Sequence, residues 1–363
     1  MSSSSPHNPS LDALAPGGHD ASLALATERA WCREALLRVS RTFALNIRVL
    51  RGRMLESVRL AYLLCRAADA LEDSWPGTPE AVGERFDRFL AGVDGDRAAA
   101  ESLASEAAQL RARADLAVLA RLPALLGLLD ALAPGDADDV RTCVRTMATG
   151  MRRYATRAAA RGATVPYLDD DAELHDYCYV VAGCVGEMLS RLVTRALPHD
   201  DPATAARRLA LSPIVGEALQ LTNILLDWPV DVRAGRCHIP ASWITRHGLS
   251  PRDLVRDLPV SRELSLRLAS LAHDALDRVP DYLETIPTRE HRYRLFCLLP
   301  ALWARASLRQ ALSRPDFHCA PVRPRIGRKR ILIETARGVL AHGHHGATRH
   351  VLQPQGPTRT RER

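Results

Sequence analysis

Two groups of acidic residues in this sequence have the spacing of metal-binding carboxylates. The first group is Asp69, Glu72 and Asp73, at the end of an apolar segment with helical periodicity. Residues three and four apart lie on one face of a helix, so the three carboxylates project together. Like charges this close repel one another unless a cation or a positive side chain lies among them. Taken alone, the group is also consistent with a solvated surface, and that alternative stays open.

The second group lies in a more apolar setting. Asn223 and Asp227, four residues apart, share a helix face with Gln220 nearby, and Asp231 follows four residues later. Apolar residues flank this polar stripe at positions 219, 221, 224, 225 and 226. A helix that is apolar nearly all round is buried, and buried carboxylates and amides need partners. The second group is therefore a stronger signal of a binding site than a charged surface patch.

Pro229 bears on how the second group is arranged. Because proline lacks an N–H and its ring clashes with the carbonyl four residues back, the sequence predicts that the helix kinks or ends near Trp228. Asp231 then lies on a loop, which makes its alignment with Asp227 less regular than that of a helical pair.

Helices must position both groups. From residue 21 to about residue 311 the chain is a succession of segments with helical period, and strand-like alternation is nearly absent. The predicted helices are 21–39, 53–73, 78–93, 99–132, 136–161, 171–196, 203–228, 262–284 and 290–311. Short stretches that contain proline separate them, as at Trp75-Pro76-Gly77. The sequence thus predicts an all-α fold with one continuous domain over residues 21–312.

The two ends of the chain have a different composition. Residues 1–20 are rich in Ser, Pro and Gly and are predicted to be a disordered arm. Residues 313–363 are predicted to form a Pro-spaced linker, a short helix at 329–341 and a tail rich in His, Gly, Pro and Arg. The tail residues His342, His344, His345 and His350 could bind a metal, but we favour a solvated flexible tail.

The composition excludes several classes of protein. The chain has 363 residues, 47% of them apolar and 25% charged, which is an ordinary globular composition. Its net charge of +7 comes almost wholly from arginine, and no run of aromatics interleaved with arginine supports binding to nucleic acid. The eight cysteines include no C-x-x-C pair, which favours reduced thiols in the cytoplasm. Charged residues interrupt the most apolar stretches, 116–133 and 177–193, so we expect membrane contact to be peripheral.

Carboxylate clusters about 150 residues apart on separate helices predict a bundle in which facing helices hold divalent metal between them. Oxygen ligands without His or Cys indicate Mg²⁺, which usually keeps waters and is completed by substrate phosphate. Arg41, Arg66 and Arg236 lie near these segments and could clamp diphosphate oxygens bidentately. A reaction in which diphosphate leaves and a carbocation remains in an apolar pocket needs this arrangement.

Five segments, in order, resemble the motifs of the squalene/phytoene synthase family. They are V-S-R-T-F-A at 39–44, Y-L-L-C-R-A-A-D-A-L-E-D at 62–73, Y-C-Y-V-V-A-G-C-V-G at 177–186, Q-L-T-N-I-L-L-D-W-P-V-D at 220–231 and G-R-C-H-I-P at 235–240. A single acidic motif would be weak evidence, whereas five in order are specific. A class I terpene cyclase would also bind metal through carboxylates, but the segment at 177–186 would not be expected in it.

The resemblance implies a single-domain class I isoprenoid synthase bundle with a central apolar cavity. Carried onto this sequence, it implies that magnesium and diphosphate bind to Asp69, Asp73, Asp227 and Asp231. It implies diphosphate or substrate contacts for Ser40, Arg41, Arg66, Gln220, Asn223 and Arg236, and catalytic roles for Tyr62, Tyr177 and Arg66. The family ionises one allylic diphosphate, couples the cation to a second substrate to give a cyclopropylcarbinyl diphosphate, and rearranges that intermediate.

The resemblance also bears on the product. Phe296, Cys297 and Pro300 match the F-C-x-x-P segment of squalene synthases, and 325–329 resembles their basic segment, whereas Tyr179 matches phytoene synthases. We therefore expect two farnesyl diphosphates to give squalene, with NADPH as reductant and arginines holding its phosphate. Leu226 stands where the family usually has arginine, so presqualene diphosphate, dehydrosqualene and phytoene remain alternatives, as does a silent isoprenoid-binding homologue. The sequence leaves the oligomeric state open.

Overall fold

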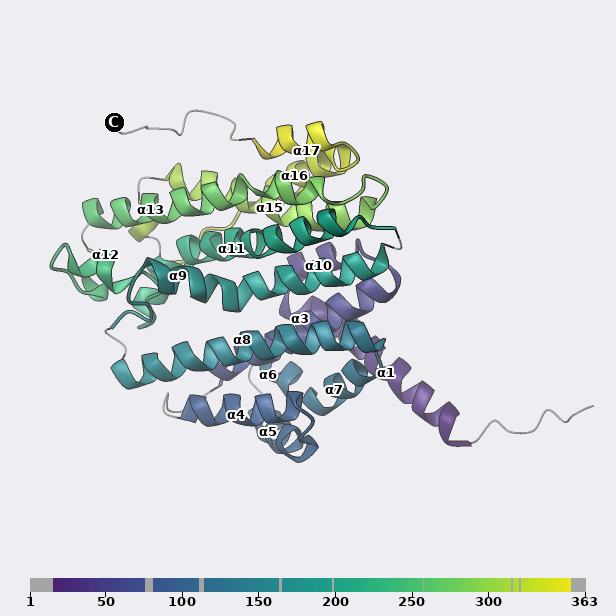
Figure 1. The fold of residues 1–363 in the computed structure, drawn as a ribbon. Helices are drawn as coiled ribbons and strands as arrows, with labels where there is room; N and C mark the ends of the chain where they lie inside the picture. The colour runs from purple at the N-terminus through teal and green to yellow at the C-terminus, as the bar shows by residue number, and fades with distance from the viewer. Residues whose placement is uncertain are drawn as a thin grey trace, which may run out of the picture.

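All regular secondary structure is helical in the part of the chain that the structure describes. The computed structural model describes residues 16–75, 81–110, 114–162, 165–197, 199–256, 258–314, 316–319 and 321–353. Within these ranges no strand forms, and the helices gather into one bundle (Figure 1). The predicted all-α fold class is confirmed.

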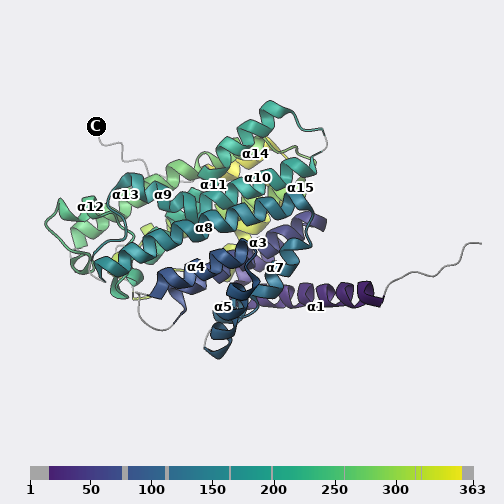
Figure 2. The same cartoon turned by 60° about the horizontal axis from the view of Figure 1, so that its bottom comes forward.

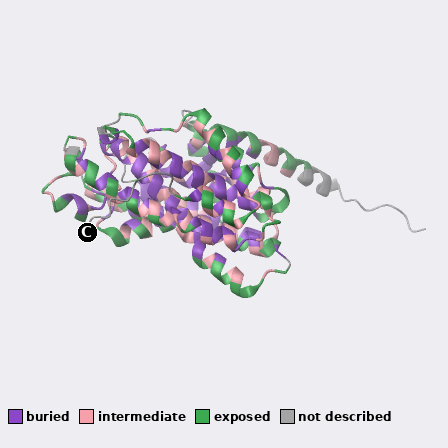
Figure 3. Ribbon diagram, turned by 90° about the horizontal axis from the view of Figure 1, so that it is seen from above, coloured by how far each residue is buried: buried purple, intermediate pink, exposed green. Residues whose placement is uncertain are grey.

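Five long helices lie side by side and form the centre of the bundle (Figures 1 and 2). They are α3 (Gly52–Asp73), α8 (Pro134–Arg161), α10 (Cys184–Ala196), α11 (Pro202–Arg233) and α15 (His291–Leu312). Each packs on the next in that order. Leu63 and Leu71 on α3 and Leu225 on α11 are fully buried. Buried residues gather in the middle of the molecule (Figure 3). Apolar residues at helical spacing thus build one continuous core.

The other α-helices surround this centre. They are α1 (Pro16–Val39), α2 (Arg41–Ile47), α4 (Val82–Val93), α5 (Arg97–Gln109), α6 (Ala114–Leu119), α7 (Leu122–Asp130), α9 (Asp171–Cys178), α12 (Ala241–Thr245), α13 (Leu258–Leu276), α14 (Val279–Glu284), α16 (Arg328–Ala341) and α17 (His345–Leu352). Helices α4 and α5 lie at one edge of the bundle and α16 and α17 at the opposite edge (Figure 1). Helix α1 begins inside the predicted arm, and residues 1–15 and 354–363 lie outside the described residues.

Three predicted helices are divided in the structure. The segment 99–132 forms α5, α6 and α7, with Pro123 in the first turn of α7, where a missing N–H costs nothing. The segment 262–284 forms α13 and α14, and Pro280 lies in the first turn of α14. The segment 171–196 contains a π-helical stretch, Tyr179–Gly183, between α9 and α10. Helical periodicity continues across these breaks, so it could not reveal them.

Helix α11 runs through Pro229 and ends at Arg233, so the predictions of a helix end near Trp228 and of a loop at Asp231 are wrong. Packing on both sides of the proline holds the helix. The Trp228 side chain is 2% exposed, and its Nε1 donates to Ser265 Oγ on α13 at 3.2 Å. Val232, beyond the proline, is buried as well. This burial outweighs the proline penalty of about 3 kcal/mol.

Helix α11 is also long and apolar enough, by length and composition, to cross a membrane. Half of its most apolar window is buried inside the bundle. It packs on α10, α13 and α15. It is therefore best explained as a core helix.

The predicted short helix near 329–341 is confirmed, but the prediction of a flexible histidine-rich tail is wrong as far as Gln353, where the description ends. Helix α17 packs on α14, α15 and α16. The buried guanidinium of Arg294 donates to the carbonyl of His342 at 2.6 Å and to Thr348 Oγ1 at 3.3 Å. Within the described ranges, no three His, Cys, Asp or Glu side chains form a metal-binding group, so the tail histidines build no such site there.

We predict that Gly186→Ala lowers the free energy of unfolding by about 2–3 kcal/mol, because overpacked cores must shift. A Cβ at position 186 would collide with the carbonyl oxygen of Ser212, where α10 approaches α11. The Ser212 carbonyl belongs to the backbone of α11, so it cannot rotate away from the new Cβ as a side chain can. Urea unfolding followed by circular dichroism measures the change.

Gly127→Ala on α7 is the matched control, because a Cβ there meets no atom within 4 Å. That substitution is expected to raise the free energy of unfolding by roughly 0.5–1 kcal/mol through helix propensity. Equal stability of the two variants would contradict the close approach of α10 and α11.

Candidate active site

The first acidic cluster occupies the last two turns of α3. Asp69, Glu72 and Asp73 lie there, as the helical spacing predicts. Arg66, one turn earlier, places its Nη1 3.1 Å from Asp69 Oδ2. The same guanidinium donates to both carboxylate oxygens of Asp115 on α6, at 3.0 Å each. Arg66 is thus an ion-pair partner of Asp69, and its two hydrogen bonds to Asp115 fix the orientation of the guanidinium.

The second cluster lies on one face of α11. Because the helix continues to Arg233, Asn223, Asp227 and Asp231 follow one another at intervals of four residues. Arg323, from the segment before α16, donates through Nη2 to Asn223 Oδ1 at 2.9 Å. Its Nη1 lies 2.8 Å from Asp227 Oδ2. Gln220 completes the row, since its Oε1 accepts from Asn223 Nδ2 at 3.4 Å.

The loop after α11 returns toward Asp231. Gly235 has φ +81°, a conformation that favours glycine and turns the chain back. Arg236 then places Nη2 2.8 Å from Asp231 Oδ1, and the His238 ring nitrogen lies 3.9 Å from the other carboxylate oxygen. The carbonyl of Cys237 accepts from the Tyr167 N–H at 2.8 Å, which fixes the loop.

The two clusters lie within electrostatic reach of each other. Burial raises the pKa of Glu72 to about 8, with further contributions from Asp73 and Asp69 on α3 and from Asp231 on α11. Burial also raises the pKa of Asp69 to about 6, opposed first by Arg66. Burial raises the pKa of Asp227 to about 6, opposed first by Arg323. Carboxylates from α3 and α11 therefore repel one another across a shared space.

Aromatic side chains border this space. The Tyr177 ring lies 5.0 Å from the His238 ring and meets Tyr154 edge-on at 5.3 Å. Burial, with Glu72 and Asp73 nearby, raises the pKa of Tyr177 well above its usual value, so its phenol stays protonated. The Tyr62 ring lies 5.5 Å from Phe43, and burial raises its pKa as well.

The carboxylates fit a magnesium–diphosphate complex. No group of three ligating side chains forms among the residues the structure describes. Mg²⁺ does not require one, because it is usually bound by one or two carboxylates, waters and substrate phosphates. Burial raises the pKa of Asp69 and of Asp227 because it deprives the ionised carboxylates of solvation, and a bound cation would stabilise that ionised form. Asp69 and Asp73 on one side, and Asp227 and Asp231 on the other, are the residues that would hold it.

The structure brings most of the predicted residues together, including Ser40, whose side chain contacts that of Tyr62; Arg41 is the exception. Ser40 caps α2, and its Oγ accepts from the Phe43 N–H at 3.3 Å. Arg41 is exposed on the first turn of α2. Sequence reasoning did not assign Asp115, Arg323, Tyr167 or His238 to the site and left Glu72 out of the ligand set. His238 lies inside the matched G-R-C-H-I-P segment, so its position in that motif was an available signal; Asp115 and Arg323 gave none.

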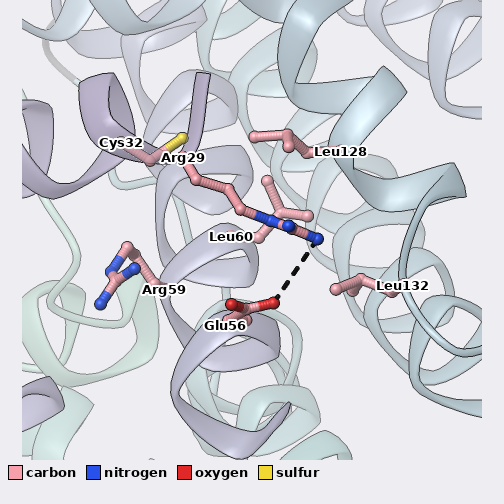
Figure 4. Close-up of a pocket in the computed structure, with 7 residues that line it drawn as sticks. All are labelled: Arg29, Cys32, Glu56, Arg59, Leu60, Leu128 and Leu132. Carbon is pink, nitrogen blue, oxygen red and sulfur yellow. Dashed lines mark ion pairs between the residues drawn. The ribbon is translucent and has the colours of Figure 1, made fainter. Parts of the chain in front are cut away.

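A small pocket outside this site lies between α1, α3 and α7 (Figure 4). Arg29 and Glu56 pair across it at 3.7 Å, with Leu60 and Leu128 at its floor. Its volume of ≈ 20 Å³ holds roughly one water molecule, too little for an isoprenoid chain. This pocket is therefore not the predicted apolar cavity, which stays a prediction.

Comparison with known proteins adds to this geometry. A family model described as squalene/phytoene synthase matches residues 36–330. Squalene synthase of Schizosaccharomyces pombe is 28% identical over 303 residues, which cover 82% of this chain and 62% of that protein. Human squalene synthase is 27% identical over 315 residues, 85% of this chain and 70% of that protein. The 15-cis-phytoene synthase of Pantoea ananas is 38% identical over 109 residues, 30% of this chain and 31% of that protein.

Solved structures share the fold. The complex of TcSQS with the ligand BPH1237 matches with a TM-score of 0.73 and 22% identity, over 90% of this chain and 89% of that chain. A dehydrosqualene synthase in complex with a ligand matches with a TM-score of 0.60 and 21% identity, over 88% of this chain and 98% of that chain. The likeness of the arrangement of helices thus extends over most of the molecule.

Proposed function

Because the chain belongs to the squalene/phytoene synthase family, we propose that it joins two farnesyl diphosphates head to head, through presqualene diphosphate, to squalene. The observation that carries the proposal is the pair of facing carboxylate clusters on α3 and α11, each with an arginine in contact. Similarity to squalene synthases over more than four fifths of the chain supports this product branch. Mg²⁺ and NADPH are the proposed cofactors.

The arginines and the aspartates divide the work of binding diphosphate. Arg236 and Arg323 each pair with one aspartate of the site, whereas Arg66 pairs with both Asp69 and Asp115, and all three guanidinium groups are proposed to bind diphosphate oxygens. When bound, Mg²⁺ supplies positive charge that stabilises the leaving diphosphate. The protonated Tyr177 hydroxyl is proposed to donate a hydrogen bond to those oxygens as negative charge develops.

In the proposed reaction two carbon–oxygen bonds break in succession. The C1–O bond of the first substrate breaks, and diphosphate departs with the electron pair. The allylic cation adds to the 2,3 double bond of the second substrate, and the departed diphosphate takes up the proton whose loss closes the cyclopropane of presqualene diphosphate. The second C–O bond then breaks and the carbon skeleton rearranges; NADPH, when bound, would supply the hydride that converts the resulting cation to squalene.

A second candidate product is presqualene diphosphate itself, and dehydrosqualene and phytoene are further alternative products. The non-enzymatic alternative is a silent homologue that binds isoprenoid. Leu226 favours a reaction that ends at presqualene diphosphate. This residue replaces an arginine of the family motif, and its side chain is apolar and only 3% exposed. Arg323 instead brings a guanidinium to Asn223 and Asp227 from 100 residues away in the chain. We propose that Arg323 takes over the diphosphate contact that position 226 does not make.

Arg323→Ala is accordingly expected to lower kcat/KM for farnesyl diphosphate about 10-fold to 100-fold, the range for a lost hydrogen bond to a charged group. Arg314→Ala, a surface arginine that faces Asp316 at 3.5 Å, should leave kcat/KM unchanged. Steady-state kinetics at saturating Mg²⁺ compares the two variants. A faster Arg323→Ala enzyme would mean that this arginine only blocks Asp227.

Removal of metal provides the test of catalysis. Release of diphosphate from farnesyl diphosphate should fall to background with EDTA and return on addition of excess Mg²⁺. Release measured with a coupled pyrophosphatase assay reports turnover whatever the hydrocarbon product. Absence of release from farnesyl and geranylgeranyl diphosphate alike would favour the silent homologue.

We also propose that the protein is located in the cytoplasm, with peripheral membrane contact.

A further inference from the structure

Helix α16 turns an apolar face to solvent. Leu332, Ile333, Val339 and Leu340 are 69%, 42%, 47% and 82% exposed. With Ala336 between them, they follow the spacing of three, four, seven and eight residues that defines one face of a helix. A surface helix of a globular protein ordinarily turns such a face to the core. We call these five residues the α16 stripe.

The opposite face of α16 fixes this orientation. Glu334 is 1% exposed, and its carboxylate pairs with Arg330 at 2.5 Å and Arg337 at 2.6 Å. Gly338 packs so closely on α15 that a Cβ would lie 2.8 Å from Leu299 Cδ2. Arg309 of α15 places its Nη2 3.7 Å from Glu334 Oε1, so this contact and the close approach of Gly338 hold the Glu334 side of the helix inward. Rotating the stripe toward the core would expose Glu334 and break both contacts with α15, so the stripe faces solvent.

Positive charge lies at one end of the stripe. Arg328 and Lys329 are exposed on the first turn of α16, and Lys329 shares the face of Ile333 and Ala336. Glu334 is the one acidic residue of α16, and it is buried. The exposed face therefore combines leucine, isoleucine and valine with cations and carries no carboxylate. This is the composition of helices that lie in the plane of a membrane interface.

We propose that the α16 stripe docks on a lipid bilayer that contains anionic headgroups. Side chains of the stripe would enter the boundary between headgroups and acyl chains, and Arg328 and Lys329 would lie among the headgroup phosphates. A second copy of the chain is a poorer occupant, because it would bring an equally basic molecule of net charge +7. Helix α16 lies beside α17, on the side of the bundle opposite α4 and α5 (Figure 1).

Vesicle sedimentation with the full chain tests this inference. The wild-type protein should sediment with phosphatidylcholine vesicles that contain phosphatidylglycerol, and more weakly with phosphatidylcholine alone. Leu332→Glu combined with Leu340→Glu should lower the ratio of bound to free protein by about tenfold or more. Lys329→Glu should weaken binding only to the anionic vesicles. The control is Leu266→Glu, at a leucine of α13 that is 51% exposed outside the stripe, which should bind as wild type does.

Several outcomes would overturn the proposal. They are a wild-type protein that stays in the supernatant, a Leu332→Glu and Leu340→Glu variant that still binds, and a control variant that loses binding equally. A wild-type dimer that this double variant dissociates, without any vesicle binding, would assign the stripe to a second copy. Thermal unfolding checks that each variant is folded, and solvent-exposed positions should tolerate glutamate. Because no substrate is present, the result is independent of the proposed reaction.

Discussion

Replacing Asp69 or Asp227 with asparagine is expected to lower kcat/KM for farnesyl diphosphate by a factor on the order of 100 to 1,000. Each substitution removes a carboxylate that would hold the cation opposite the leaving diphosphate. Asparagine keeps the shape of the side chain and can still accept a hydrogen bond from Arg66 or Arg323. Steady-state kinetics over a range of Mg²⁺ concentrations measures the loss.

Stability should move little or rise in the same variants. Burial raises the pKa of both aspartates to about 6, so above that pH each is ionised in the folded protein at a cost in folding free energy. Removing the charge therefore removes this cost at neutral pH. Asp94→Asn, at a surface aspartate paired with Arg145, is the control and should keep wild-type kinetics. Wild-type rates in the Asp69 and Asp227 variants would contradict the assignment of the site.

Tyr177→Phe is expected to lower kcat about 100-fold with a smaller change in KM, because the proposed hydrogen bond strengthens as the diphosphate departs. The phenylalanine ring keeps the edge-on contact with Tyr154 and the contact with His238. Folding should therefore be unaffected. Single-turnover measurements separate the chemical step from product release.

Tyr282→Phe provides the comparison for the loss of a tyrosine hydroxyl away from the site. The Tyr282 hydroxyl hydrogen-bonds to Ser190 Oγ at 3.0 Å and to the Tyr293 hydroxyl at 2.7 Å, inside the core. Its removal should lower stability by about 1 kcal/mol and leave kcat near wild type. If Tyr177→Phe changed stability and spared kcat instead, Tyr177 would be a packing residue only.

The predictable part of the site came from spacing within single helices. Asp69 and Asp73 share a face of α3, and Asn223 and Asp227 share a face of α11, because both helices have strong apolar periodicity. The order of the five motifs supplied the family and the fold class. These features depend on local sequence, which a single chain displays in full.

The remaining features depend on contacts between distant segments. Asp115 joins Arg66 across 49 residues, and Arg323 joins Asn223 across 100, and no local pattern encodes either pairing. The continuation of α11 through Pro229 follows from the burial of Trp228 against α13, a tertiary effect that overrides local propensity. The order of α17 likewise follows from the buried Arg294, which donates to Thr348 across 54 residues of the chain.

Product identification tests the central claim most directly. The purified protein is incubated with farnesyl diphosphate and Mg²⁺, with and without NADPH, and the products are analysed by mass spectrometry. We predict squalene only with NADPH, and two diphosphates released for each squalene formed. Presqualene diphosphate in both tubes would place the end of the reaction at the first coupling, and formation of no head-to-head product from farnesyl or geranylgeranyl diphosphate would contradict the proposed function.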